Sequence, residues 1–110
     1  MTVKPNYLEL RAPDLAAAQT FYERAFGFAF TSYGENYSAV EGGAVTIGLL
    51  RAPVAPPLPL FESQQLDDDL ARVLAAGAVL VKPIESYPGG RRFHVKDPAG
   101  NEIAVYQSDA

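Results

Sequence analysis

The sequence has no cysteine, no tryptophan and a single histidine, His94. Without cysteine there can be no disulfide, zinc–thiolate site, iron–sulfur cluster or cysteine nucleophile. With one histidine, no metal site built from two or three histidines can form within one chain. The absence of cysteine also fits a reducing compartment, so we expect a cytoplasmic protein.

Long apolar runs and long basic runs are missing as well. No 18-residue apolar stretch is present and the N-terminus lacks the apolar core of a signal peptide, so we expect no membrane partner. The net charge is −4 and no basic run is longer than Arg91-Arg92, so we expect no nucleic-acid partner. Neither a G-x-S-x-G elbow nor a nucleotide-binding glycine pattern occurs.

The composition that remains is typical of one globular domain. The chain has 110 residues, of which 48% are hydrophobic and 20% are charged. In its first half, residues 7–12 alternate in polarity and predict a strand. Asp14 precedes, and Gly27 follows, a helical spacing of apolar residues that predicts a helix over 15–26. Three further strands are predicted, at 28–33, 37–40 and 44–51.

The same order restarts after a segment that holds four prolines, residues 52–59, which we interpret as a connector. The elements predicted beyond it are a strand at 60–63, a helix at 66–76, and strands at 78–84, 91–96 and 102–107. The acidic run Asp67–Asp69 is expected to be a solvated helix start. The sequence therefore predicts an α+β fold with an internal βαβββ repeat in a single domain, residues 1–110. Module 1 spans about 5–51 and module 2 about 60–108; two unrelated α+β halves are the alternative.

Three stretches carry a resemblance to a known family. LELRAPDLAAAQTFYERAFGF and FHVKDPAGNEIAVYQ resemble the opening and the closing hairpin of the vicinal-oxygen-chelate superfamily, which includes glyoxalase I, extradiol dioxygenases and bleomycin-resistance proteins. The middle, LARVLAAGAVLVKPIESYPGGRRFHVKDPAGN, is similar to the branch of predicted enzymes related to lactoylglutathione lyase. The resemblance implies two modules whose mixed sheets curve into a cup with the helices outside. It also implies frequent dimerisation, and we expect a homodimer.

The resemblance further implies, for metal-using members, a divalent ion in the cup held by histidine, glutamate or glutamine. Those positions fall on Tyr7, near Thr46, near Leu58 and on Ala104, and none of these residues is a usual ligand. The resemblance thus supports the fold and argues against the glyoxalase I mechanism, and we expect no cofactor. A divalent metal held only by carboxylates, from Glu9, Glu62 and Glu102, stays open.

Strand alternation predicts which side chains line the cup. They are Tyr7, Glu9, Arg11, Tyr37, Thr46, Glu62, Arg92, His94, Glu102, Ala104 and Tyr106. Tyrosines opposite small residues would leave room for a flat, partly apolar ligand. Alternatively, the tyrosines only fill the centre of a dimer, and the arginines either pair with glutamates or bind an anion.

His94 is the candidate acid or base, because its unperturbed pKa of about 6.5 suits proton transfer. Arg92 beside it would favour the neutral ring. Alternatively, His94 is a lining residue that makes one hydrogen bond. Asp97 is expected to bond the amides of its own turn.

Three functions follow from these observations. The first is metal-independent binding of a small hydrophobic or aromatic molecule, as in drug-sequestering members of the superfamily. The second is a lyase or isomerase acting on a small carbonyl compound, with a metal held by glutamates or with His94 and no metal. The third is a regulatory or structural dimer without a ligand.

Overall fold

A computed structural model describes residues 3–109 and divides them into two compact units. The N-terminal unit comprises residues 7–58, and the C-terminal unit comprises residues 59–109 together with residues 3–6. Both units combine one helix with a mixed sheet, which confirms the predicted α+β class. No helix within residues 3–109 has the length and apolarity needed to cross a membrane.

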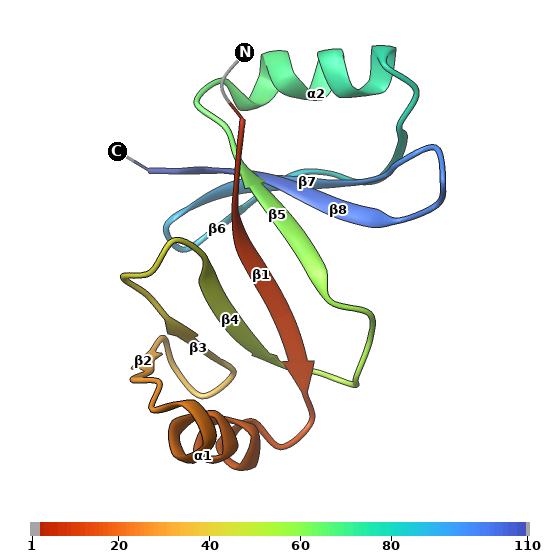
Figure 1. The fold of residues 1–110 in the computed structure, drawn as a ribbon. Coiled ribbons are helices and arrows are strands. Elements are labelled where there is room, and N and C mark those ends of the chain that lie inside the picture. Colours follow the sequence, from red (N-terminus) through yellow and green to blue (C-terminus); the bar gives the residue numbers. More distant parts are fainter. Residues whose placement is uncertain (1–2, 110) are drawn as a thin grey trace. The chain divides into compact units, whose positions relative to one another are not determined.

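The N-terminal unit has the order βαβββ. Its elements are β1 (Lys4–Ala12, of which residues 7–12 belong to this unit), α1 (Leu15–Phe26), β2 (Thr31–Ser32), β3 (Tyr37–Val40) and β4 (Thr46–Arg51). The strands lie in the order β2-β3-β4-β1, in which β1 and β4 are parallel and the other pairs are antiparallel (Figure 1). The helix bounds agree with the prediction.

Both ends of α1 follow the sequence signals. The Asp14 carboxylate accepts a hydrogen bond from the Ala17 amide at 3.0 Å, which satisfies a free amide of the first turn. Gly27 ends the helix in the left-handed region, at φ 71°, which other residues rarely adopt. Along the helix only Leu15 is buried, whereas Phe21 and Phe26 are 57% and 62% exposed.

The C-terminal unit repeats the order. Its elements are β5 (Leu58–Glu62, of which residues 59–62 belong to this unit), α2 (Leu66–Ala75), β6 (Val79–Tyr87), β7 (Gly90–Lys96) and β8 (Glu102–Ser108). The strands lie in the order β5-β8-β7-β6, with β5 and β8 parallel. Helix α2 lies across one face of this sheet (Figure 1). Leu66 of α2 packs there against Phe93, Val95 and Val105. These three residues alternate along β7 and β8 with the residues predicted to line the cup, so alternation assigned them to the correct face.

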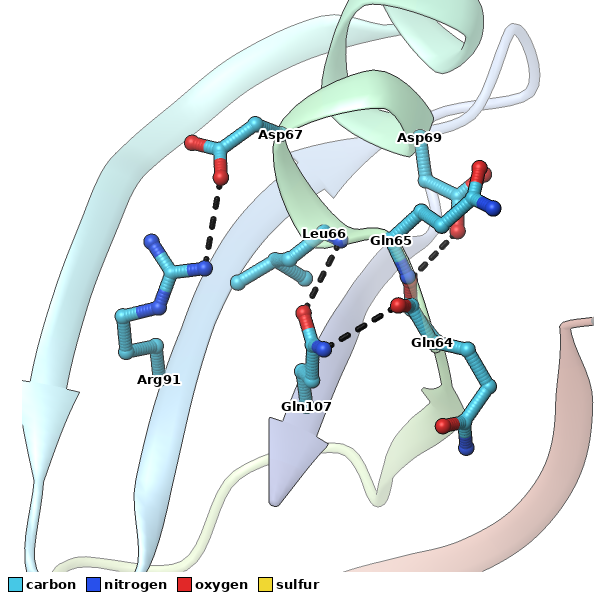
Figure 2. A network of polar contacts seen from close by, with 8 residues as sticks. Gln64, Gln65, Leu66, Asp67, Asp69, Arg91 and Gln107 are labelled. Carbon is cyan, nitrogen blue, oxygen red and sulfur yellow. Dashed lines mark hydrogen bonds and ion pairs between the residues drawn. The ribbon is translucent and has the colours of Figure 1, made fainter. Parts of the chain in front are cut away.

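A side chain from β8 caps α2. Gln65 at the helix start makes no side-chain cap, and the Gln107 carboxamide takes its place. It accepts from the Leu66 amide at 3.0 Å and donates to the Gln64 carbonyl at 3.1 Å (Figure 2). This contact ties the helix start to the sheet.

The prediction of a solvated acidic helix start is wrong for Asp69. Asp69 is 4% exposed, and it accepts hydrogen bonds from the Ser63 hydroxyl and the Arg72 guanidinium, both at 2.5 Å. The Ser63 hydroxyl in turn accepts from the Gln65 amide at 2.9 Å. Asp67 is exposed, as expected, and forms an ion pair of 3.3 Å with Arg91.

Strand bounds differ from the prediction by one to three residues in most strands, and three of the differences have a physical reason. The strand predicted at 28–33 reduces to Thr31–Ser32, because Phe28 packs its ring against Tyr22 and Phe26 of α1. Strand β5 begins at Leu58, inside the predicted connector, because Pro59 occupies the start of a strand, where proline is tolerated. Strand β6 extends to Tyr87, and shifts of register around Lys82 accommodate Pro83 in this outermost strand of the unit's sheet.

Candidate functional site

The predicted site residues of the N-terminal unit share one face of its sheet. The register pairs Tyr7 with Thr46, Glu9 with Gly48, and Arg11 with Leu50, which in turn pairs with Tyr37. Because paired residues on neighbouring strands project to the same side, Tyr7, Glu9, Arg11, Tyr37 and Thr46 lie together on that face.

Two tyrosines and a glutamate form a hydrogen-bonded chain on this face. The hydroxyls of Tyr7 and Tyr37 lie 2.5 Å apart, and the Tyr37 hydroxyl donates to a Glu9 carboxylate oxygen at 3.2 Å. Glu9 is only 2% exposed. Burial raises the pKa of Tyr37 far above its usual value, and the Glu9 charge raises it further. Tyr37 therefore stays protonated and donates to Glu9, while Tyr7 donates to Tyr37.

Gly48 provides the space for this chain. A Cβ atom at this position would overlap the Tyr37 hydroxyl and would lie 2.9 Å from the Tyr7 hydroxyl. The tyrosine rings thus occupy the room that the missing side chain leaves in β4.

On the C-terminal sheet, the predicted residues lie on the face opposite α2, in two rows across the strands. Leu60, Ala104, His94 and Lys82 form one row. Glu62, Tyr106, Arg92 and Glu85 form the other. Lys82 was missed from sequence, because the bulges around it break the alternation of β6; Pro83 was the signal for such an irregularity.

His94 is buried and its ring is held by a carboxylate. The residue is 2% exposed, and Nδ1 lies 3.0 Å from a carboxylate oxygen of Glu102. Burial lowers the pKa of His94 below its usual value, Arg92 and Lys82 lower it further, and Glu102 opposes them. At neutral pH the ring is therefore neutral. Because a carboxylate accepts only, Nδ1–H donates to Glu102 and Nε2 carries the lone pair.

A second hydrogen-bonded chain joins Tyr106 to Glu62. The Tyr106 hydroxyl donates to the Asn6 side-chain oxygen at 2.7 Å, and the Asn6 amide donates to Glu62 at 2.9 Å. Sequence reasoning missed Asn6, because strict alternation along β1 assigns it to the face of Leu8. The available signal was the polar side-chain amide of Asn6 on the same strand face as Leu8 and Leu10, which are apolar.

The remaining polar groups surround these rows. The Arg92 guanidinium lies 5.7 Å from the centre of the Tyr87 ring, a cation–π contact. An open, largely polar cavity of about 480 Å³ lies at the carboxyl ends of β5 and β8. Its lining residues are Glu62, Gln64, Arg91, Gln107, Ser108 and Asp109. Of these, only Glu62 was a predicted site residue.

Asp97 makes the contacts expected of a turn residue. Its carboxylate accepts from the Ala99 and Asn101 amides, both at 2.9 Å, and from the Asn101 side chain at 3.0 Å. These hydrogen bonds lower the pKa of Asp97, and the one from the Asn101 side chain has the largest effect. Asp97 therefore shapes the hairpin between β7 and β8.

The residues at the implied metal positions do not fit a divalent ion. The register pairs Tyr7 with Thr46 and, in the second module, pairs Ala104 with Leu60, two residues beyond the predicted Leu58. Ala104 is completely buried and offers only a methyl group. Leu58 and Leu60 offer no donor atom either.

The three candidate carboxylates are each bound to a different side chain. Glu9 accepts from Tyr37, Glu62 accepts from Asn6, and Glu102 holds His94. Within residues 3–109, no three histidine, aspartate or glutamate side chains lie close enough together to hold a metal ion.

Comparison with known proteins places this geometry in context. Residues 4–105 match the family described as the Glyoxalase/Bleomycin resistance protein/Dioxygenase superfamily. Two relatives are 25% identical to the chain. One is CFP32 of Mycobacterium tuberculosis, which is provisionally named a glyoxylase. The match covers 96% of this chain but only 46% of the length of CFP32. Virulence protein STM3117 of Salmonella typhimurium is matched over 93% of this chain and 82% of its own length.

Solved structures show the same fold at lower identity. Methylmalonyl-CoA epimerase from Mycobacterium tuberculosis has a TM-score of 0.80 and 17% identity, over 97% of this chain and 89% of that one. Homoprotocatechuate 2,3-dioxygenase from Arthrobacter globiformis has a TM-score of 0.75 and 20% identity, over 96% of this chain and 36% of that one. These similarities support the fold and no particular activity.

Proposed function

The chain belongs to the glyoxalase/bleomycin resistance protein/dioxygenase superfamily, and from that premise we propose that it binds a small, partly apolar molecule without a metal ion. The proposed surface is the face of the C-terminal sheet opposite α2. The observation that carries the proposal is Ala104, a buried methyl group where a metal-binding member would have a carboxylate. A site without donor atoms at this position favours apolar contact over coordination.

The side chains around Ala104 suit such a ligand. Leu60 and Ala104 are paired neighbours and give the site an apolar floor. His94 lies beside Ala104 in the same row, and Tyr106 and Arg92 lie in the next row. An apolar floor with a few polar groups at its border is the usual composition of a small-molecule site. On the sheet of the N-terminal unit, Tyr7 and Tyr37 stay predicted ligand contacts of that unit's own face, and their hydrogen bonds fix the orientation of their rings.

A ligand screen by nuclear magnetic resonance tests the proposal. Small aromatic molecules are titrated into protein freed of metal with EDTA, and again with Mg²⁺, Mn²⁺ or Zn²⁺ added. We expect saturable shifts at His94 and its neighbours with equal affinity in both series. Binding that requires a metal ion would refute the proposal, as would the absence of any saturable shift at these residues.

A pair of alanine variants locates the site. Ala104→Leu overfills this buried face and should weaken binding at least tenfold, because Ala104 is completely buried and the added methyl groups displace the side chains around it. Ala75→Leu, on the exposed surface of α2, is the matched control and should leave binding unchanged. Circular dichroism checks that both variants fold. Unchanged binding in a folded Ala104→Leu variant would exclude this face.

The His94–Glu102 pair favours a second candidate, a lyase or isomerase acting on a small carbonyl compound without a metal. Neutral Nε2 would take a proton from the carbon beside the carbonyl, and Glu102 would stabilise the imidazolium that forms. Lys82 and Arg92 would favour the negative charge developing on the carbonyl oxygen. Deuterium exchange from solvent into dihydroxyacetone, lost in His94→Gln, would support this candidate; exchange that survives the substitution would refute it.

We also propose that the protein acts as a homodimer in the cytoplasm. Exposed Phe21 and Phe26 on α1 and Val79 on β6 support self-association, and the absence of cysteine supports a reducing compartment. Sedimentation equilibrium should give twice the mass of the chain. A monomer at high micromolar concentration would contradict the proposed homodimer.

A further inference from the structure

One cavity of the C-terminal unit takes no part in the binding face around Ala104. It is the open, polar cavity of about 480 Å³ at the carboxyl ends of β5 and β8. Neither Ala104 nor His94 lines it, and Glu62 is the one lining residue that also belongs to a row on that face. Its volume lies within the range of small-molecule sites, so it has room for a molecule larger than a bare ion.

Glu62 lines this cavity as a carboxylate with a fixed orientation. One of its oxygens, Oε1, accepts a hydrogen bond from the Asn6 side-chain amide at 2.9 Å. The Asn6 side-chain oxygen in turn accepts from the hydroxyl of buried Tyr106 at 2.7 Å. Within residues 3–109, no group donates to the second carboxylate oxygen, Oε2. Glu62 is therefore an acceptor held in place before a ligand arrives, which lowers the ordering cost of binding.

The charged groups at the cavity are mostly negative. In the part of the chain that the structure describes, neither Glu62 nor Asp109 forms an ion pair. Arg91, the cation among the lining residues, lies 3.3 Å from the exposed Asp67 carboxylate (Figure 2). Three carboxylates and one guanidinium give these four side chains a combined charge of −2. A ligand with two positive charges would balance them.

The arrangement of acceptors suits ammonium groups better than a metal ion. Among residues 3–109, no three histidine, aspartate or glutamate side chains lie close enough together to hold a metal ion. An ammonium group needs no such cluster, because each of its three N–H donors can reach a separate acceptor. The Ser108 hydroxyl and the Gln64 side-chain oxygen line the same cavity and supply neutral acceptors. The Gln107 carboxamide is already bound to the Leu66 amide and the Gln64 carbonyl, so it forms a rigid wall (Figure 2).

We infer that this cavity binds a short aliphatic diamine or polyamine, with ammonium groups at Glu62 and Asp109. These two carboxylates come from the end of β5 and from the residue after β8, so a molecule charged at both ends contacts both. A ligand carboxylate would have to compete with Asp67 for Arg91, which disfavours amino acids. The inference adds a second site to the proposed function and does not depend on it.

Three probes of equal chain length test the inference: 1,4-diaminobutane, 1-aminobutane and the zwitterion 4-aminobutanoate. Each is titrated at low ionic strength while nuclear magnetic resonance follows the backbone amides of Gln64, Ser108 and Asp109. We expect 1,4-diaminobutane to bind about threefold to fivefold more tightly than 1-aminobutane, the factor for one more exposed ion pair, and added salt to weaken its binding. The zwitterion should bind most weakly. Tightest binding of 4-aminobutanoate, or no saturable shift with 1,4-diaminobutane, would overturn the inference and leave the proposed function standing.

Charge-removing variants locate the site. Glu62→Gln, which can still accept from Asn6, and Asp109→Asn should each lower the affinity for 1,4-diaminobutane to that of 1-aminobutane. Asp68→Asn makes the same charge change at an exposed residue outside the cavity, so it is the matched control and should leave the affinity unchanged. Arg91→Gln removes the lining cation and should tighten binding about twofold to threefold. An equal loss in Asp68→Asn would mean that binding follows net charge alone and would overturn the inference, as would weaker binding to Arg91→Gln.

Discussion

Replacing Gly48 with alanine tests the packing of the tyrosine chain in the N-terminal unit. A Cβ atom at this position would overlap the Tyr37 hydroxyl and would lie 2.8 Å from Tyr37 Cζ and 2.9 Å from the Tyr7 hydroxyl. The backbone of Gly48 does not require glycine, since its φ lies outside the left-handed region. Only the side chains oppose the substitution, so its cost measures their packing.

The expected cost combines three contributions. Overpacking a close-fitting interior costs about 1–3 kcal/mol. If Tyr37 moves, its hydrogen bond to the Glu9 carboxylate is lost, and a bond to a charged group contributes about 1.5–3 kcal/mol. Removing a strand glycine returns about 0.5–1 kcal/mol. We therefore expect Gly48→Ala to lower the free energy of unfolding by about 2–4 kcal/mol.

Urea denaturation followed by far-ultraviolet circular dichroism measures this loss. With a urea dependence of about 1–3 kcal/mol per molar, the midpoint should fall by about 1–2 M. Gly43→Ala is the matched control, because a Cβ there meets only the Val45 carbonyl at 3.7 Å. Tyr37→Phe removes the overlapping hydroxyl and should cost less in the Gly48→Ala background than alone. A Gly48→Ala variant as stable as the unmodified protein would refute the arrangement of Tyr7, Tyr37 and Gly48.

Three further predictions concern the C-terminal unit. Gln107→Ala should lower the free energy of unfolding by about 1 kcal/mol, because the Leu66 amide loses its cap. The control is Gln64→Ala, which keeps the Gln64 carbonyl. Equal melting temperatures for Gln107→Ala and the unmodified protein would refute the capping role. Because the folded pKa of Asp97 is lowered, its contribution is present above the unfolded pKa of about 3.9 and is lost as pH falls through the folded value. Asp97→Asn should therefore melt at a lower temperature at pH 7, and the difference should shrink as pH falls below about 3.9; a difference that does not shrink at acid pH would contradict this. His94 also has a lowered folded pKa, so stability should fall as pH drops below about 6.5 toward that value, and His94→Phe should remove this dependence; titration of the single labelled histidine at or above 6.5 would refute the shift.

The sequence predicted the elements with regular local signals. The helix over 15–26 has a capping aspartate before it and a glycine after it, and both signals act locally. Alternation likewise assigned Phe93, Val95 and Val105 to the face that α2 covers. The prediction failed at Pro59, where strand pairing with distant residues overrides the local proline preference. The predicted strand over 78–84 included Pro83 but ended three residues before β6 does.

The site was predicted as a set of residues but not as a set of contacts. Alternation grouped Tyr7, Glu9 and Tyr37, and the hydrogen-bonded chain among them emerged only from the pairing of β1 with β4 and β3. The His94–Glu102 pair depends on the register of the β7–β8 hairpin, which places the two residues within reach diagonally across the strands. The neutral state of His94 was expected from Arg92, whereas its largest cause is burial. The roles proposed for these residues stay predictions.

The divalent-metal content of the purified protein, measured together with ligand affinity, tests the central proposal most directly. Ala104 offers no donor, and each candidate glutamate is bound to another side chain. We predict far less than one equivalent of divalent metal per chain by inductively coupled plasma mass spectrometry, and an affinity for small aromatic molecules that EDTA does not change. One equivalent of bound metal whose removal abolishes ligand binding would contradict the proposal.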